Sequence, residues 1–456
     1  MMIAALWRPI VVWRGLPTYI SIEFLFLFFS YLIYFYPYQL HVLGIADISR
    51  SGFIVGPTFT DESNRAIMLA SIGMTAFRAG LKALKSRPTD QPASAVRSQA
   101  SGYFDRVTSD MIAGPVLLLQ VLLISIYLAF GWRAAGEGRY NGETSTNSVV
   151  EGVYLLIVVF GMISFAVLIF PTERGQPTSR SPSVLLGAVV AGAWAIRLLL
   201  NGDRNSFLLI ALVAVGGLLT FRIRKGRWVL FLFGVSAILL YNAIEALRSG
   251  EITSLFDFFA DQNAPASGKS RDGDSSFNIT TIGVRGALAG VPGTIDYGFG
   301  IFKLIGVLGV IPLIRGAVIP IDTPYKTSSD VLNQIVLGGP SAGWSIGTSV
   351  ISDSYIDFGV LGVPVLLFLV GAFAKYTENG VRSHPDSLWR AVLYLLTLAL
   401  VTEVPRYAFD FPVRPLVWAV LLFWVVSMFT PALRASVRGD EQFRSSQGGG
   451  FGSAKF

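Results

Sequence analysis

Long apolar runs dominate this sequence and limit the folds open to it. The hydrocarbon core of a bilayer is about 30 Å thick, and a helix of roughly 20 residues crosses it. Ten stretches reach or approach that length: 19–38, 65–83, 111–131, 149–170, 184–200, 207–221, 228–247, 358–375, 388–404 and 415–433. Two of them, 65–83 and 184–200, carry Arg78 and Arg197 near their ends, where a long side chain reaches the interface. The pattern predicts an all-α polytopic membrane protein with about ten transmembrane helices in one integral-membrane domain, 1–456.

The composition excludes several classes of protein. Only 14% of the residues are charged and 52% are hydrophobic, whereas soluble domains carry roughly 25% charged residues. An ordinary soluble enzyme and a long disordered chain are therefore excluded. The net charge of +7 does not indicate a nucleic-acid partner, because such binders gather Lys and Arg on a soluble face. With no cysteine and only His41 and His384, no disulfide, metal site or cofactor is expected.

The distribution of charge over alternate loops predicts the orientation in the membrane. Lys and Arg are in excess on the loops that share a side with both termini, and acidic residues are in excess on the other side. By the positive-inside rule, both termini are expected in the cytoplasm. The longest non-spanning stretch, 248–356, then forms a large outer loop, and 434–456 forms a flexible cytoplasmic tail. The apolar patch 304–314 is too short to cross and is expected to lie as an interfacial or re-entrant helix.

Polar residues that could carry chemistry lie in four segments of the predicted outer side. The segments hold Arg133 and Arg139 (132–147), Arg204 (201–206), Arg285, Arg315, Asp296 and Tyr297 (248–356), and Arg406 and Tyr407 (403–414). An arginine at this boundary is either a ligand for an anion or a snorkelled anchor, and Arg406 could simply pair with Asp410. The acids Asp353 and Asp357 are either bases or residues of a helix start.

Two short segments resemble a known family. Residues 347–362, GTSVISDSYIDFGVLG, are similar to the G-T-S…D-F-G-x-x-G signature of bacterial O-antigen and exopolysaccharide repeat-unit polymerases of the Wzy type. The turn 202–206, GDRNS, is similar to that family's short G-x-R-x-(S/P) connection. The number of spans and the late outer loop also match. The Arg-x10-Gly pattern of some of these polymerases is absent, since Val150 stands eleven residues after Arg139.

The resemblance implies a membrane glycosyltransferase of the inner membrane. Such an enzyme moves a growing glycan from undecaprenyl diphosphate to the next undecaprenyl-diphosphate-linked repeat unit at the outer face, without a cofactor. It implies lipid-linked oligosaccharide and membrane lipid as partners, together with a protein that regulates chain length. A diphosphate leaving group requires fixed positive charge, and the acceptor hydroxyl requires a base.

The candidate residues follow from that chemistry. The expected catalytic residues are Arg204, Arg285, Arg406, Asp296 and Asp353. The expected substrate-binding residues are Arg133, Arg139, Arg315, Asp357, Tyr297, Tyr355 and Tyr407, of which the tyrosines either stack on sugars or pack against the protein.

Other functions are also compatible with parts of the sequence. An O-antigen ligase would use a histidine in its large outer loop, and 248–356 contains none. A flippase or transporter of lipid-linked sugars would favour charged residues along several spans and an internal repeat. A non-catalytic membrane scaffold would have no use for the outer arginines.

Overall fold

The computed structural model describes residues 10–13, 16–51, 54, 56–84, 103–134, 148–171, 181–223, 226, 228–236, 243, 276–310, 325–339 and 345–448. Within them the chain is helical apart from one short antiparallel hairpin, β1 (Ile10–Trp13) with β2 (Leu16–Thr18). The helices of the first half are α2 (Ile22–Tyr34), α3 (Tyr36–Val42), η1 (Thr60–Glu62), α4 (Ser63–Ala83), η2 (Tyr103–Arg106), α6 (Ser109–Ala129), α7 (Ser148–Ile169), α8 (Pro182–Leu200) and α9 (Arg204–Phe221). Those of the second half are α12 (Ser276–Gly290), α13 (Ile301–Leu308), α15 (Ser328–Leu337), α16 (Val350–Ser383), α17 (Leu388–Leu400) and α18 (Asp410–Gly448).

The expectation of an all-α polytopic membrane protein is confirmed. In the described part of the chain, six helices are long and apolar enough to cross a bilayer: α6, α7, α8, α9, α16 and the first half of α18. Two further predicted spans are shorter apolar helices, α2 and α17. The predicted span 65–83 forms α4, which is less apolar, and the predicted span 228–247 lies only partly within the described residues.

Helix ends gather in two groups, as alternating spans require. At one end, here called the site end, contacts join the end of α2 to the loop after α17 and the start of α7 to the start of α9. At the opposite end, the side chain of Arg222 after α9 donates to the carbonyl of Ile169 in α7 at 3.1 Å, and Ser387 before α17 donates to Asp105. The helices therefore traverse the bundle in alternate directions.

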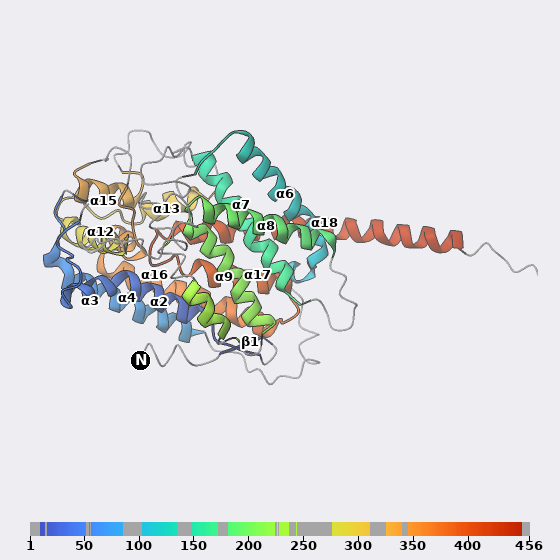
Figure 1. The fold of residues 1–456 in the computed structure, drawn as a ribbon, viewed down its shortest axis with the longest axis horizontal. Helices are drawn as coiled ribbons and strands as arrows, with labels where there is room; N and C mark the ends of the chain where they lie inside the picture. Colours follow the sequence, from blue (N-terminus) through green and yellow to red (C-terminus); the bar gives the residue numbers. More distant parts are fainter. Residues whose placement is uncertain are drawn as a thin grey trace, which may run out of the picture.

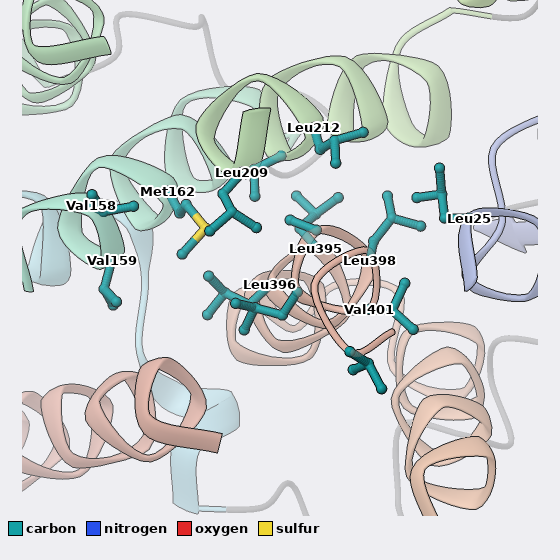
Figure 2. Packing of buried hydrophobic residues seen from close by; sticks show 14 of the residues in the cluster. Leu25, Val158, Val159, Met162, Leu209, Leu212, Leu395, Leu396, Leu398 and Val401 are labelled. Atoms are coloured by element: carbon teal, nitrogen blue, oxygen red, sulfur yellow. The ribbon is translucent and has the colours of Figure 1, made fainter. Parts of the chain in front are cut away.

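Helix α17 lies at the centre of the bundle. All of its residues except Arg390 are buried. Figure 2 shows Leu395, Leu396 and Leu398 of this helix among buried side chains from α7, α9 and α2. A helix that is apolar on all sides is stable only when other helices surround it, which explains why a helix of 13 residues can occupy this position.

Helices α4 and α16 pack with their backbones unusually close. A Cβ on Gly80 would lie 2.1 Å from the carbonyl oxygen of Phe368, and a Cβ on Gly371 would lie 2.1 Å from that of Phe77. Small residues at a membrane helix interface permit such close approach. The 2.8 Å ion pair between Arg78 and Glu23 joins α4 to α2, so the arginine predicted to reach the interface has a partner on a neighbouring helix.

Short helices cover the site end. Figure 1 shows α12, α13 and α15 together at one end of the molecule, while the last part of α18 extends away from the other. The apolar patch predicted to lie at the interface contributes to the eight-residue α13, which ends at Leu308. The segment expected as a tail, 434–456, continues α18 as far as Gly448, the first of three consecutive glycines.

Candidate active site at the end of α17

An irregular, buried segment forms the centre of the site end. The helix α17 ends at Leu400, four residues before the predicted end of the span, and α18 begins at Asp410. Residues 401–405 between them are buried. This burial is required, because non-helical backbone inside a membrane protein is tolerated only where it is surrounded by protein or lines a cavity. The N–H groups of Arg406 and Tyr407 both donate to the carbonyl of Glu403 at 3.0 Å, and the hydroxyl of Tyr34 donates to the carbonyl of Pro405. The segment therefore has a fixed path.

The second component is the turn between α8 and α9. Gly202 adopts a φ of 82°, a conformation that favours glycine. Asp203 then caps α9 by accepting the N–H groups of Asn205 and Ser206 at 3.1 Å each, and its second carboxylate oxygen accepts the hydroxyl of Tyr154. Arg204 begins the helix and is 6% exposed. The turn holds its arginine inside the protein, in contrast to a snorkelled anchor.

Asn205 joins these two components. Its Oδ1 accepts a 3.0 Å hydrogen bond from Nη1 of Arg406, and its Nδ2 donates a 2.7 Å hydrogen bond to the hydroxyl of Tyr407. The ring of Tyr407 also stacks on Phe411, with centroids 4.3 Å apart. Asn205 therefore fixes both the guanidinium and the phenol, and the predicted residues Arg204, Arg406 and Tyr407 come together.

A simple salt bridge between Arg406 and Asp410 was one alternative for this loop, and both residues have other partners in the structure. Asp410 pairs with Arg414, one turn further along α18, while Arg406 turns toward Asn205. Asp410 finds this partner because helix α18 places residue 414 on the same face as residue 410.

The sequence reading did not select Glu403, whose carboxyl group interacts electrostatically with Arg204 and Arg406. It is 4% exposed, and its Oε2 has no hydrogen-bond partner among the described residues. Desolvation raises the pKa of its carboxyl group to about 7, an effect that Arg406 and Arg204 oppose and Asp203 reinforces. Its place at the end of a predicted span concealed this role; the available signal was a carboxylate two residues before Pro405 and three before Arg406.

A second cluster of charge adjoins the first. Nζ of Lys303 on α13 lies 2.8 Å from Asp353 and 3.0 Å from Asp357. Asp353 also accepts the hydroxyl of Ser328 at 2.6 Å and the backbone N–H of Phe409 at 2.9 Å. Because Phe409 belongs to the loop that carries Arg406, the two clusters are joined. Lys303 was also absent from the sequence-based candidates, since its partners stand some fifty residues later in the chain.

The D-F-G-x-x-G part of the signature has a structural explanation. The carboxylate of Asp357 caps α13 by accepting the N–H groups of Gly300 and Lys303 at 3.2 Å each. Gly359 has a φ of 65° and breaks α16, and a Cβ there would lie 3.3 Å from Tyr297. Asp357 therefore belongs to α16 but caps the start of α13. In α16 itself, Ser349 and Ser352 form the cap.

The G-T-S part of the signature lies beside Arg406. A small pocket is lined by Arg406, by Thr280 and Gly283 of α12, and by residues 346–349 just before α16. Gly347 in this stretch has a φ of 72°. The lining of this pocket brings Arg406 next to the G-T-S segment and α12.

Other predicted residues lie elsewhere. Arg285 is fully buried on α12, where its Nη2 donates to the carbonyl of Ile48 at 3.3 Å and its Cζ lies 5.8 Å from the ring centre of Tyr38. Burial lowers the pKa of its guanidinium. Its Nε and Nη1 have no hydrogen-bond partner in the described part of the chain. These contacts place Arg285 against α3 and the loop after it.

The remaining candidates are peripheral, packed or outside the described residues. Arg133 and Asp296 are exposed. Tyr297 packs edge-on against Tyr355, whose hydroxyl donates to the carbonyl of Val291 at 3.2 Å. Arg139 and Arg315 lie outside the described residues. Within the described ranges, no three His, Asp or Glu side chains gather as metal ligands.

The fold and this site define a polytopic membrane protein with buried cationic groups at one end of its bundle. The chain matches the family model for O-antigen polysaccharide polymerase Wzy over residues 18–433. It belongs to that family and is thus an integral-membrane O-antigen repeat-unit polymerase acting on lipid-linked repeat units. No curated protein and no solved structure matches it.

Proposed function

We propose that this polymerase transfers the growing glycan from undecaprenyl diphosphate to the next undecaprenyl-diphosphate-linked repeat unit, at the outer face of the bacterial inner membrane. The observation that supports it is the convergence of Arg204 and Arg406 around Asn205, next to the pocket at residues 346–349. Both termini would then lie in the cytoplasm, and a regulator of chain length would act as a further partner.

The reaction determines what the site must supply. The bond between the anomeric carbon of the donor glycan and its phosphate oxygen breaks, and a hydroxyl oxygen of the acceptor unit forms the new bond to that carbon. Negative charge develops on the departing diphosphate, and the hydroxyl proton must leave. Arginine offers planar, paired N–H groups to phosphate oxygens, and charge held in place before the reaction stabilises the transition state most effectively.

Arg406 is the primary candidate for contact with the diphosphate. It lines the pocket and is only half-buried, whereas Arg204 is buried behind it. We assign Arg406 to the leaving diphosphate and Arg204 to the electrostatic potential of the site. Tyr407 remains a proposed sugar contact, and Arg133, Arg139 and Arg315 remain proposed contacts of the glycan and its carrier.

The acids of the second cluster are better suited to organise the site than to accept a proton. Asp353 and Asp357 are both engaged with Lys303 and with backbone or hydroxyl donors. Their carboxylate oxygens are therefore occupied by donors from α13, α15 and the loop after α17, and these contacts hold the three segments together. Asp296, which is exposed, remains a proposed base, and Arg285 remains a proposed phosphate contact.

The function is tested in a host deleted for this gene. Restoring the wild-type chain should restore a ladder of long glycans, whereas Arg406→Ala and Arg204→Ala should leave a single repeat unit on the lipid core. Arg65→Ala is the control, because Arg65 is exposed and forms an ion pair with Glu62, three residues earlier in the chain. Equal amounts of each protein in the membrane must be verified by immunoblot.

The deletion alone distinguishes the alternatives. Polymer stranded on its carrier with no attached glycan would indicate a ligase, and units retained at the cytoplasmic face would indicate a flippase. Normal ladders in both arginine variants would refute the assignment of the diphosphate to these side chains.

A further inference from the structure

Glu403 is the one acid at the centre of the site whose carboxylate is not fully engaged by hydrogen bonds. Asp203 accepts three donors, and Asp353 and Asp357 share Lys303. By contrast, Oε2 of Glu403 has no donor among the described residues although the side chain is 4% exposed. A buried carboxylate without its full set of donors is costly, so this arrangement calls for a functional explanation.

The charged groups around Glu403 come from two elements. Arg406 belongs to its own loop, and Asp203 and Arg204 belong to the turn that starts α9. The phenols of Tyr407 and of Tyr154 on α7 complete the polar surroundings, the latter bonded to Asp203. Two arginines thus face two acids, and the group carries no net charge when Glu403 is ionised.

An incoming diphosphate disturbs this balance. A diphosphate linked to both a sugar and a polyprenyl chain carries two negative charges at neutral pH. If the diphosphate binds both arginines, their positive charges are neutralised by it, and the two negative charges of the diphosphate come close to Glu403. In a buried site such repulsion is weakly screened, and a proton on the carboxylate removes it.

We propose that Glu403 is the internal counterion of Arg204 and Arg406, and that it takes up one proton when a disubstituted diphosphate binds to these arginines. The carboxylate and one solvent proton become a carboxylic acid on binding, and the same proton returns to solvent on release. No other bond changes. Glu403 is in this sense a positioning residue, and the inference depends on the proposed role of the arginines in binding diphosphate.

The coupling has a definite sign. Binding that raises the pKa of a group is tighter at low pH and weakens as pH rises through the pKa of the free protein. Since burial places the pKa of Glu403 at about 7 in the free protein, affinity should fall about tenfold between roughly pH 6 and pH 8, the limit for one obligatory proton.

The test measures binding to the full chain in lipid nanodiscs. The probe is a synthetic N-acetylglucosaminyl polyprenyl diphosphate, whose two charges do not change over this pH range. Wild type should show the tenfold decrease in affinity, and Glu403→Gln should bind with an affinity that varies less than about twofold with pH. Glu378→Gln is the matched control, because Glu378 is also buried but pairs with Lys375 and Arg382 at the opposite end.

A second measurement requires no variant. Calorimetric titration of the wild type near pH 7.5, in two buffers with different ionisation enthalpies, gives the number of protons taken up per probe. We expect roughly 0.5 to 1 proton. Uptake near zero, or an affinity independent of pH in the wild type, would overturn the proposal.

The two proposals fail in different ways. Binding that is lost in Arg406→Ala but shows no proton uptake overturns the role of Glu403 and leaves the proposed function intact. Binding that is unchanged in Arg406→Ala, or absent at every pH in the wild type, overturns the diphosphate site itself and with it the role of Glu403.

Discussion

Nη1 of Arg406 donates a 3.0 Å hydrogen bond to Oδ1 of Asn205, a residue 201 positions earlier in the chain. The same amide donates to Tyr407 at 2.7 Å. One side chain at the start of α9 therefore orients two groups of the loop between α17 and α18. Because the amide of Asn205 is uncharged, it orients the guanidinium of Arg406 without cancelling its positive charge.

Asn205→Ala should reduce polymerisation much more than stability. Loss of a hydrogen bond of this kind costs about 1 kcal/mol of unfolding free energy. A misplaced catalytic group, however, can lower the rate by about 100-fold. The measurements are glycan chain length in cells and the melting temperature of the purified protein.

Asn201→Ala is the control for that substitution. Asn201 lies in the same turn but is exposed. If Asn205→Ala gives long chains like the control, Asn205 does not orient Arg406 in the working enzyme.

Lys303→Met should destabilise the protein strongly. It leaves the carboxylates of Asp353 and Asp357, which are 3% and 0% exposed, without their shared cation. Breaking a buried ion pair by removing one partner costs about 3–5 kcal/mol. The expected results are a lower melting temperature and less protein in the membrane, with partial recovery in Lys303→Met/Asp353→Asn.

Lys326→Ala provides the comparison, because Lys326 is exposed near the start of α15. An unchanged melting temperature in Lys303→Met would show that the two acids do not depend on Lys303.

Gly359→Ala should be destabilising by about 1–2 kcal/mol, because residue 359 has a φ of 65° and left-handed backbone is costly for a residue with a Cβ. The new Cβ would also lie 3.3 Å from Tyr297. Gly114→Ala is the matched change, since Gly114 is inside α6 and has no atom within 4 Å of an added Cβ. Gly359→Ala should therefore have a clearly lower melting temperature than Gly114→Ala. Equal melting temperatures would argue against a strained turn at residue 359.

The sequence was sufficient to locate most of the long apolar helices and part of the site. Apolar runs locate helices by length alone, and a short turn such as 202–206 restricts where Arg204 can lie. Asp353 and Asp357 lie in the first turns of α16, as the helix-start alternative expected. The role of Asp357 could not be predicted, because it caps α13, which stands earlier in the chain. Capping across distant segments leaves no local pattern.

The burial of single polar residues could not be predicted from the sequence, for a similar reason. Arg285 looks like any arginine of an outer loop, yet it is fully buried and contacts α3 and the loop after it. Glu403 looks like the polar end of an apolar span, yet the irregular chain after Leu400 turns it inward. Both depend on tertiary packing between segments that are far apart in sequence.

Asp203→Asn should move the pH dependence of diphosphate binding toward acid. The charge of Asp203 raises the pKa of Glu403, so neutralising it makes Glu403 easier to ionise. The carboxylate then loses its proton at a lower pH, and affinity for the disubstituted probe begins to fall below the midpoint near 7 expected for the wild type. Asparagine still accepts the N–H groups of Asn205 and Ser206, so the cap of α9 is retained. Asp330→Asn, which alters the cap of α15 instead, should leave the midpoint unchanged. A midpoint that moves toward alkali in Asp203→Asn would contradict the electrostatic coupling between Asp203 and Glu403.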